Sequence, residues 1–288
     1  MSRVMAFYSK HDRIFRKLVP SVAKLSYNLA FKMAGDTVAR IVAQPFPELR
    51  DLPPNHLCVR IGAGNRVFNG HVNFIQAGNQ TWLAFLARNY CTSRSDVVEL
   101  GCGCGRLARP LRDPVWDPWF EGTYVGVDID KEMIEYCRQN FPPERFQFIL
   151  SPHKSRTYSR GKLPDESKVA FDLTIAAEDS KDFVYSLSLF SHLLEAEAVD
   201  YLQESYRILR AGGIMFLTFF CMEHVELGQR WTFAHRCGNA YVENPHYPEA
   251  AVAYKEAFMT ELARKCGFRE VTVAPRGGNR QSELVARK

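Results

Sequence analysis

The chain contains 288 residues, of which 46% are hydrophobic and 24% charged, and its net charge is +5. This length and composition suffice for one large core, or for one core with an appended lid, and no run approaches the roughly 20 consecutive apolar residues of a membrane-spanning helix. The eight cysteines form no Cys-x-x-Cys pair, so we expect no metal and a reduced, cytoplasmic protein.

Residues 1–50 are predicted to be helical and basic. Apolar residues such as Ile14, Leu18 and Leu25 recur every three or four positions. Nine Lys and Arg against three acids give this segment a net charge of +6. That charge is typical of a solvated helix face, and it also fits peripheral contact with a membrane, a nucleic acid or an acidic partner. A cleaved organelle-targeting segment is another interpretation.

The segment up to residue 90 completes a predicted helical N-terminal lid, residues 1–90. Leu52-Pro53-Pro54 interrupts the helical pattern. A short strand is expected over residues 57–63 and a helix over residues 71–90. This first third of the chain contains no sequence motif that indicates catalysis or ligand binding.

From Asp96 onward, strands alternate with helices, which predicts a parallel sheet covered on both faces and a second domain over residues 91–288. The strands are expected at 97–100, 123–127, 146–150, 183–188, 214–220, 269–273 and 283–286, the last two as a hairpin. A polar insertion at about 152–170 precedes the fourth strand. The helix before the fifth strand is expected to end at Gly212-Gly213, and the last helix at Gly267.

The first of these strands runs into Gly101-Cys102-Gly103-Cys104-Gly105. A strand that turns sharply into a helix needs residues that tolerate unusual dihedrals, and a backbone without side chains lets a ligand approach closely. In open α/β sheets, ligands bind beyond the carboxyl ends of the strands. The spacing E-x-G-x-G-x-G differs from the dinucleotide pattern G-x-G-x-x-G. It therefore favours a nucleoside ligand without a pyrophosphate over a nicotinamide cofactor.

Asp128, at the end of the second strand, is the second part of the signal. A carboxylate there can accept hydrogen bonds from both ribose hydroxyls. The structural alternative is a helix cap, but Asp130 suits that role better because the apolar helix pattern begins directly after it.

Four segments in this order resemble the class I S-adenosylmethionine (SAM)-dependent methyltransferases: VVELGCGCGRLARPL, YVGVDIDKEMIEYC, DFVYSLSLFSHLL and YRILRAGGIMFLTFF. They are most similar to a bacterial branch with the phrase GCGCGR and a serine- or threonine-containing VFxHL. The resemblance covers roughly residues 50–288. It implies a Rossmann-like α/β sheet of seven strands in the order 3-2-1-4-5-7-6, with strand 7 antiparallel. It says almost nothing about the acceptor.

The resemblance also implies SAM as cofactor, S-adenosylhomocysteine as product, and a set of binding residues. Glu99 would hold the methionine amino group, and the loop Gly101, Cys102 and Gly103 would pass under the methionyl and ribose portion. Asp128 would take the ribose hydroxyls. The other expected binding residues are Ile129 at the adenine face and Tyr185 and Ser186 near the methionyl end.

One position departs from the family pattern. Many relatives have an acid after the third strand that reads the adenine amino group, whereas this chain has Ser151-Pro152. Ser151 or His153 would substitute for that acid, or the backbone alone would read the adenine.

Methyl transfer from a sulfonium is an in-line displacement, so the protein mainly aligns the reactants and excludes water. A general base is needed where the acceptor must lose a proton. His192, after the fourth strand, is chemically suited to this, although it also fits a histidine that holds its loop by hydrogen bonding. Glu223 and His224, just past the fifth strand, are further candidate bases. Trp231 and Tyr254 fit an acceptor pocket or the core.

The resulting prediction is an enzyme that methylates oxygen or nitrogen of a small molecule, such as a sugar or a natural product. The first third of the chain and residues 221–254 would form the acceptor pocket. Methylation of a protein or peptide is an alternative, and so is an inactive cofactor-binding module that acts through partners. No Asn/Asp-Pro-Pro-aromatic motif and no strongly basic groove signature occur in the catalytic part, which argues against a nucleic-acid acceptor.

Overall fold

The computed structural model describes residues 51–61, 67–113, 120–152, 174–228, 231–276 and 281–288, together with residues 37, 41, 44 and 49. The predicted helical segment 1–50 and the polar insertion at 152–170 lie almost wholly outside the described residues, and so does His153. The chain divides into two compact units, Met1–Phe74 and Ile75–Lys288. None of the helices among the described residues is long and apolar enough to cross a membrane.

In the first unit, a short helix occupies the position where the sequence suggested a strand. Helix α4 (Asn55–Arg60) begins directly after Pro54 and buries Leu57 and Cys58. The expected strand at 57–63 is therefore wrong where the structure describes it. Pro54 is the N-cap of this helix, with φ −49° and ψ 139°, so the chain enters the helix from an extended residue. The apolar run that follows is too short for its periodicity to separate a helix from a strand. The next helix, α5 (Val67–Ala87), confirms the helix expected over residues 71–90, with earlier bounds.

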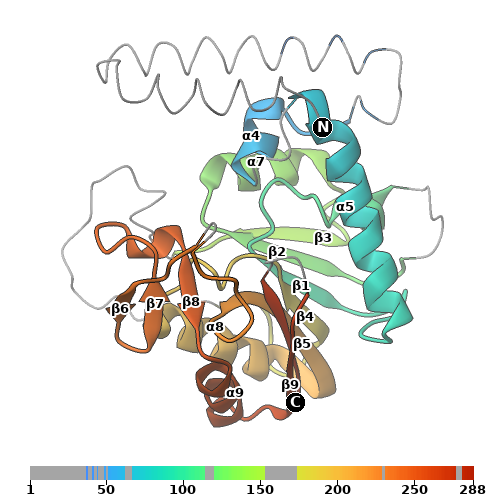
Figure 1. Cartoon of the computed structure of the whole chain (residues 1–288). Helices are drawn as coiled ribbons and strands as arrows, with labels where there is room; N and C mark the ends of the chain where they lie inside the picture. Colours follow the sequence, from blue (N-terminus) through green and yellow to red (C-terminus); the bar gives the residue numbers. More distant parts are fainter. Residues whose placement is uncertain are drawn as a thin grey trace, which may run out of the picture. The chain divides into compact units, whose positions relative to one another are not determined.

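The second unit contains one mixed sheet, and its central order confirms the prediction (Figure 1). Parallel strands lie in the order β3-β2-β1-β4-β5, β10 pairs antiparallel with β5, and β9 pairs antiparallel with β10. Counted as sixth and seventh strands, β9 and β10 give the order 3-2-1-4-5-7-6. The bounds are β1 (Val97–Leu100), β2 (Tyr124–Asp128), β3 (Phe146–Leu150), β4 (Lys181–Ser186), β5 (Leu209–Cys221), β9 (Arg269–Ala274) and β10 (Ser282–Arg287).

Three short strands that the sequence did not predict extend the sheet near the carboxyl end of β5. They are β6 (His235–Cys237), β7 (Ala240–Val242) and β8 (Val252–Tyr254), with the 3-10 helix η3 (Pro248–Ala250) before β8. β8 pairs in parallel with the last two residues of β5, while β7 pairs antiparallel with β8 on one side and with β6 on the other. At three residues each, they are too short to show an alternating pattern in the sequence.

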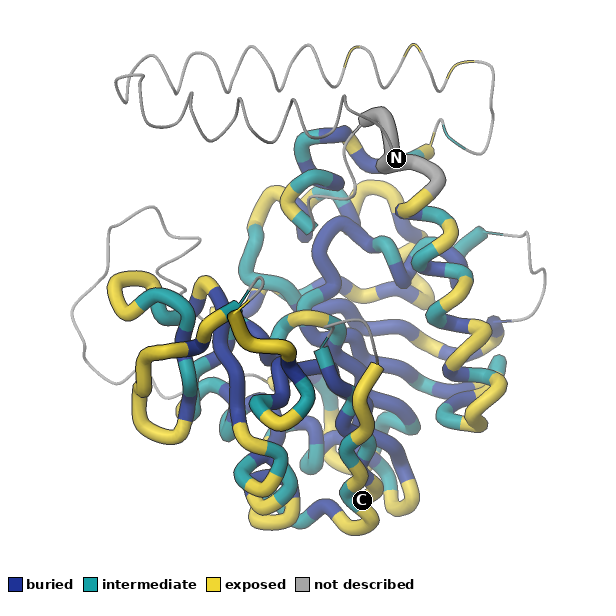
Figure 2. The backbone as a smooth tube through the Cα atoms, in the orientation of Figure 1, coloured by how far each residue is buried: buried dark blue, intermediate teal, exposed yellow. Residues whose placement is uncertain are grey.

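Helices cover both faces of the sheet, as the buried strands require. Side chains of α5, α6 (Arg109–Arg112) and α7 (Lys131–Asn140) share one apolar cluster with Ile214 and Phe216 of β5. Side chains of α8 (Glu195–Ile208) and α9 (Glu256–Lys265) share the other with Met215 and Leu217. Alternate residues of β5 thus face opposite layers, and the central strands are buried along most of their length (Figure 2).

The junction between α8 and β5 differs from the prediction. α8 ends at Ile208, and β5 already begins at Leu209. Gly212 and Gly213 therefore lie inside the strand rather than closing the helix. Gly212 adopts φ +79°, and its N–H donates to the carbonyl of Lys288, so the pair forms an irregularity near the start of β5.

Candidate functional site

The glycine-rich loop leaves β1 at its carboxyl end and is held by the neighbouring strand. The N–H groups of Gly101 and Cys102 both donate to the carbonyl of Val127, at 2.8 and 3.0 Å. Gly101, Gly103 and Gly105 all have positive φ, between +55° and +83°, which side chains disfavour. A Cβ on Gly105 would also lie 2.8 Å from the ring of Phe141. The loop can therefore follow this path only with glycine at these positions.

Asp128 ends β2 and holds the loop directly. Its Oδ2 accepts a hydrogen bond of 2.8 Å from the N–H of Gly103, and its Oδ1 accepts one of 2.9 Å from the N–H of Asp130. Asp130 caps α7 by accepting from the N–H groups of Glu132 and Met133, as predicted. The carboxylate of Asp128 is half-buried. Asp128 is thus fixed in place beside the glycine loop.

Glu99 lies in β1 and is buried with two tyrosines. The hydroxyl groups of Tyr124 and Tyr185 donate to its Oε2, at 2.5 and 3.1 Å. Burial raises the pKa of Glu99 to about 8, although the two tyrosine hydrogen bonds and the charge of Arg106 act to lower it. The carboxyl group therefore carries a proton most of the time at neutral pH unless a cation comes close to it.

Tyr185 and Ser186, from β4, are fully buried. Tyr185 contacts Glu99 through its hydroxyl, and the hydroxyl of Ser186 donates to the carbonyl of Leu100 at 3.1 Å. Both side chains thus tie β4 to β1 next to the glycine loop. Ile129, which the sequence assigned to the adenine face, is half-buried directly after Asp128.

Ser151 follows β3 and is buried beside Asp128. Its N–H donates to the backbone carbonyl of Asp128 at 2.8 Å. Its hydroxyl shares a hydrogen bond with Tyr201 of α8, whose pKa is raised to about 12, first by burial and also by the charge of Asp128. Tyr201 is therefore a polar neighbour of the site that the sequence analysis missed, because its position fits the apolar face of a helix.

His192 contacts a different segment of the chain. Its Nδ1 lies 2.9 Å from the backbone carbonyl of Glu249 in η3. A carbonyl only accepts, so Nδ1 must carry the proton, which leaves the lone pair of the neutral ring on Nε2. This contact holds two loops together, and it also fixes the tautomer that a general base would need.

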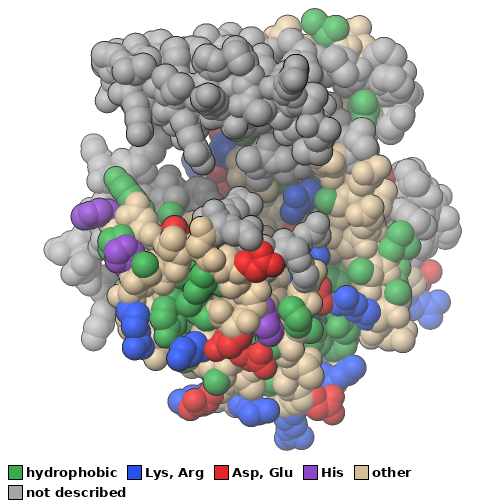
Figure 3. Space-filling view, viewed as in Figure 1, with side chains coloured by type: hydrophobic (Ala, Val, Ile, Leu, Met, Phe, Trp, Pro, Cys, Tyr) green, Lys and Arg blue, Asp and Glu red, His purple; other side chains and the backbone are tan. Residues whose placement is uncertain are grey.

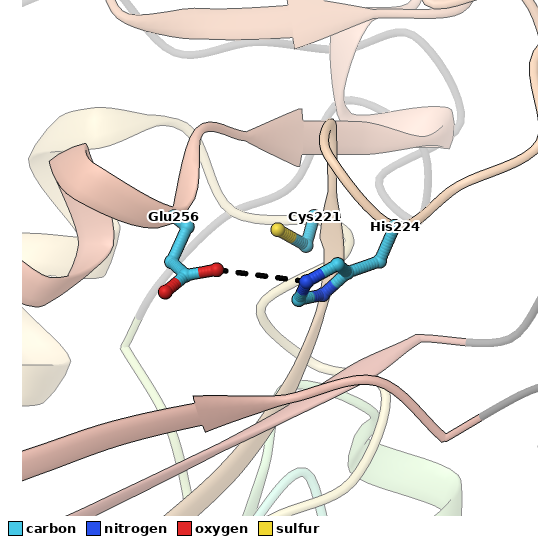
Figure 4. Close-up of side chains that lie close together, drawn as sticks. All are labelled: Cys221, His224 and Glu256. Carbon is cyan, nitrogen blue, oxygen red and sulfur yellow. Dashed lines mark ion pairs between the residues drawn. The ribbon is translucent and has the colours of Figure 1, made fainter.

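The remaining candidates lie around the carboxyl end of β5. Glu223 and His224 belong to the turn after this strand, and Oε2 of Glu223 accepts from the thiol of Cys221. His224 lies beside Cys221 and Glu256 (Figure 4). Tyr254 is fully buried, and its hydroxyl donates to the carbonyl of Leu193. Trp231 is half-buried and stacks on the ring of Phe233. Tyr254 is thus a core residue, whereas Trp231 remains partly accessible.

The fold and the loop define a class of protein: an open, doubly wound α/β domain with a glycine loop and an acid at the carboxyl ends of adjacent strands, as in nucleoside-cofactor enzymes. Residues 98–217 match the family model described as a methyltransferase domain. The chain therefore carries the domain of an enzyme, and SAM is the cofactor of that domain. The predictions of a methyltransferase and of SAM are confirmed at this level.

Individual similar proteins are more distant. A candidate methyltransferase of Invertebrate iridescent virus 6 is 29% identical over 65 residues, which is 23% of each chain. The matched segment thus spans about a quarter of that curated relative. Two similar solved structures are a SAM-dependent methyltransferase of Methanosarcina mazei and phosphoethanolamine N-methyltransferase 2 of Haemonchus contortus in complex with SAM.

The first of these structures is 17% identical, with a TM-score of 0.44, and the match covers 70% of this chain and 96% of that one. The second is 15% identical, with a TM-score of 0.49, and the match covers 73% of this chain and 52% of the other. Neither similarity identifies the acceptor of this chain.

Proposed function

We propose that this protein transfers the methyl group of SAM to an oxygen or nitrogen atom of a small molecule, such as a natural product or a sugar. The observation that supports it most is the placement of Asp128, fixed by the N–H groups of Gly103 and Asp130 at the carboxyl end of β2. A carboxylate held at this position is suited to bind a ribose through its hydroxyls.

In this proposal, the residues around the loop each contact one part of the cofactor. Asp128 accepts from the ribose, the backbone of Gly101 to Gly103 lies against the ribose and methionyl portion, and Glu99 pairs with the methionine amino group. Ile129 packs on the adenine. Ser151, whose hydroxyl is already engaged by Tyr201, replaces the family's adenine-reading acid only in part.

The bound cofactor supplies an activated methyl group, so the chain has to position the acceptor and exclude water. Where the acceptor is an alcohol or a phenol, we assign His192 the role of general base through Nε2. The carbonyl of Glu249 holds the opposite ring nitrogen, which is the arrangement that keeps Nε2 basic. The segment that follows β5 contributes to the acceptor pocket in this proposal.

We also propose that the chain is most similar to the bacterial branch of the family and that it works in a reduced, cytoplasmic setting. All eight cysteines are free thiols in the structure, which fits a reducing compartment. On the visible face of the described part, acidic and basic side chains are interspersed rather than collected into one basic patch (Figure 3). That pattern favours a small acceptor over a nucleic acid.

Calorimetric titration with SAM and S-adenosylhomocysteine, followed by turnover assays with panels of small acceptors, tests the proposal. We expect micromolar binding of both compounds and acceptor-dependent formation of S-adenosylhomocysteine. Absence of binding to the folded protein would refute the function. If the protein binds SAM and methylates a peptide but no small acceptor, the alternative of a protein or peptide methyltransferase would be favoured.

A further inference from the structure

A thiol, an imidazole and a carboxylate come together at the carboxyl end of β5 (Figure 4). Cys221 is the last residue of β5, His224 lies in the turn that follows, and Glu256 is the first residue of α9. Their potential ligand atoms all lie within 4.8 Å of one another. The group therefore joins the two ends of the segment that contains β6, β7 and β8.

The neighbours of these side chains already hold them in position. Nδ1 of His224 lies 2.9 Å from the hydroxyl of Ser282, a fully buried residue, which directs Nε2 toward Glu256. Oε2 of Glu223 accepts from the thiol of Cys221 at 3.2 Å and from the backbone N–H of Glu256 at 2.9 Å. A hydrogen-bonded second nitrogen is the usual way in which proteins orient a metal-binding histidine.

The distances between the potential ligand atoms fit coordination of a metal ion better than direct hydrogen bonds between the side chains. Nε2 of His224 and Oε2 of Glu256 are 3.6 Å apart, which is longer than an N–H···O hydrogen bond. With Zn–N and Zn–O bonds of about 2.1 Å and a Zn–S bond of about 2.3 Å, the ligand atoms of a tetrahedral site lie about 3.4–3.6 Å apart. The imidazole and carboxylate already have this spacing, and the pairs that include the sulfur need to close by about 1.2 Å at most.

The chemistry of the three groups selects the ion. A thiol and an imidazole favour Zn²⁺ over Mg²⁺ or Ca²⁺, which prefer oxygen ligands. The thiolate of Cys221 and the carboxylate of Glu256 together balance the charge of a divalent ion. On binding, the thiol of Cys221 loses its proton, which passes to solvent, and the sulfur takes up the Zn–S bond.

We propose that Cys221, His224 and Glu256 bind one Zn²⁺ ion that fastens the turn after β5 to the first turn of α9. The side chains of His224 and Glu256 are 21% and 44% exposed, so water reaches the fourth coordination position. The expectation of no metal rested on the spacing of cysteines, and this site uses only one. The proposal does not depend on methyl transfer.

The full chain, first stripped of metal with a chelator, is titrated with Zn²⁺ against a chromogenic competitor and with Co²⁺ as a spectroscopic probe. We expect one ion per chain, thiolate-to-cobalt absorption, and a higher melting temperature with Zn²⁺. Cys221→Ser should abolish the thiolate absorption, and Glu256→Gln, at a partly exposed position, should weaken Zn²⁺ binding more than about 100-fold. Ser282→Ala, which removes only the partner of His224, should weaken it about tenfold.

Cys237→Ser and His235→Ala provide matched controls, because both residues are exposed in β6, outside the cluster. These variants should bind Zn²⁺ and Co²⁺ as the unaltered chain does. Thiolate absorption that persists in Cys221→Ser, or no stoichiometric binding in a chain that still binds SAM, would overturn the proposal. Binding of SAM by the metal-free chain is measured in parallel, so failure of the zinc site and failure of the proposed function are distinguished.

Discussion

The affinity for SAM should depend on pH through Glu99. The methionine part of the cofactor carries an ammonium group, and only an ionised Glu99 pairs with it favourably. Burial raises the pKa of Glu99 from its ordinary 4.5 to about 8. Binding near neutral pH therefore requires the carboxyl group to release a proton, and we expect the affinity to rise as the pH approaches 8.

The size of the effect follows from the ionised fraction. With a pKa of about 8, about half of the Glu99 side chains are ionised at pH 8 and about 1% at pH 6. The dissociation constant for SAM should therefore fall roughly 50-fold between these pH values, equivalent to about 2 kcal/mol. In the absence of SAM, Glu99 affects folding stability in the opposite direction as the pH rises. The folded state holds this proton more tightly than the unfolded state, so stability is lost as the pH rises from 4.5 through 8.

Calorimetry at pH 6, 7 and 8, in buffers of different ionisation enthalpy, measures both the affinity and the number of protons released. Glu99→Gln should remove the pH dependence, whereas Glu132→Gln, at an exposed acid of α7, should retain it. Methylthioadenosine, which lacks the amino-acid portion, should bind the unaltered protein with little pH dependence. A flat profile for SAM, or an equal slope for methylthioadenosine, would refute the pairing of Glu99 with the amino group.

Three further changes test the same site. Tyr124→Phe removes a hydrogen bond that lowers the pKa of Glu99, so the pH of half-maximal SAM affinity should rise by about one unit in the same titration. Asp128→Asn should weaken SAM binding by about 1.5–3 kcal/mol, measured by calorimetry at fixed pH, and unchanged affinity would contradict the ribose role. Gly105→Ala should destabilise the protein by about 1–3 kcal/mol more than Gly212→Ala in denaturant titrations. Both glycines have φ near +80°, but only Gly105 has a ring within 3 Å of the added Cβ, so equal losses would contradict the steric argument.

Much of the central fold could be predicted because its signals are local and repeated. The buried strand before the glycine loop, the strand ending at Asp128 and the cap at Asp130 each have a motif of their own, and the structure places them within a residue or two. The α8–β5 junction could not be predicted in the same way. There, the N–H of Gly212 donates a hydrogen bond to the carbonyl of Lys288, 76 positions later in the chain. A contact so distant in sequence leaves no local pattern.

The candidate site, like the fold, could be predicted only where the sequence carries a local motif. The glycine loop and Asp128, both singled out by their motifs, lie side by side because both are at the carboxyl ends of adjacent parallel strands, and the structure adds a hydrogen bond between them. Tyr185 was predicted as a binding residue, but Tyr124 and the contact of both hydroxyls with Glu99 were missed, since an aromatic residue inside a buried strand is indistinguishable from ordinary core. The strand register supplies part of the missing information: Tyr185 lies directly opposite Glu99, with Gly126 on the other side.

Asp128 has two roles in these predictions: it holds the glycine loop in its conformation and it binds the cofactor. Both of its oxygens already accept a backbone N–H, so an Asn at this position would set its amide N–H₂ against one of those donors. Loss of affinity in Asp128→Asn therefore combines a displaced loop with a lost ribose contact, and the variant alone does not separate them. A cofactor analogue without the ribose 2′-hydroxyl does. If Asp128 binds the ribose, removing that hydroxyl costs affinity in the unaltered chain and much less in Asp128→Asn, because the acceptor is already lost. Equal costs in the two proteins would leave Asp128 as a support for the loop alone.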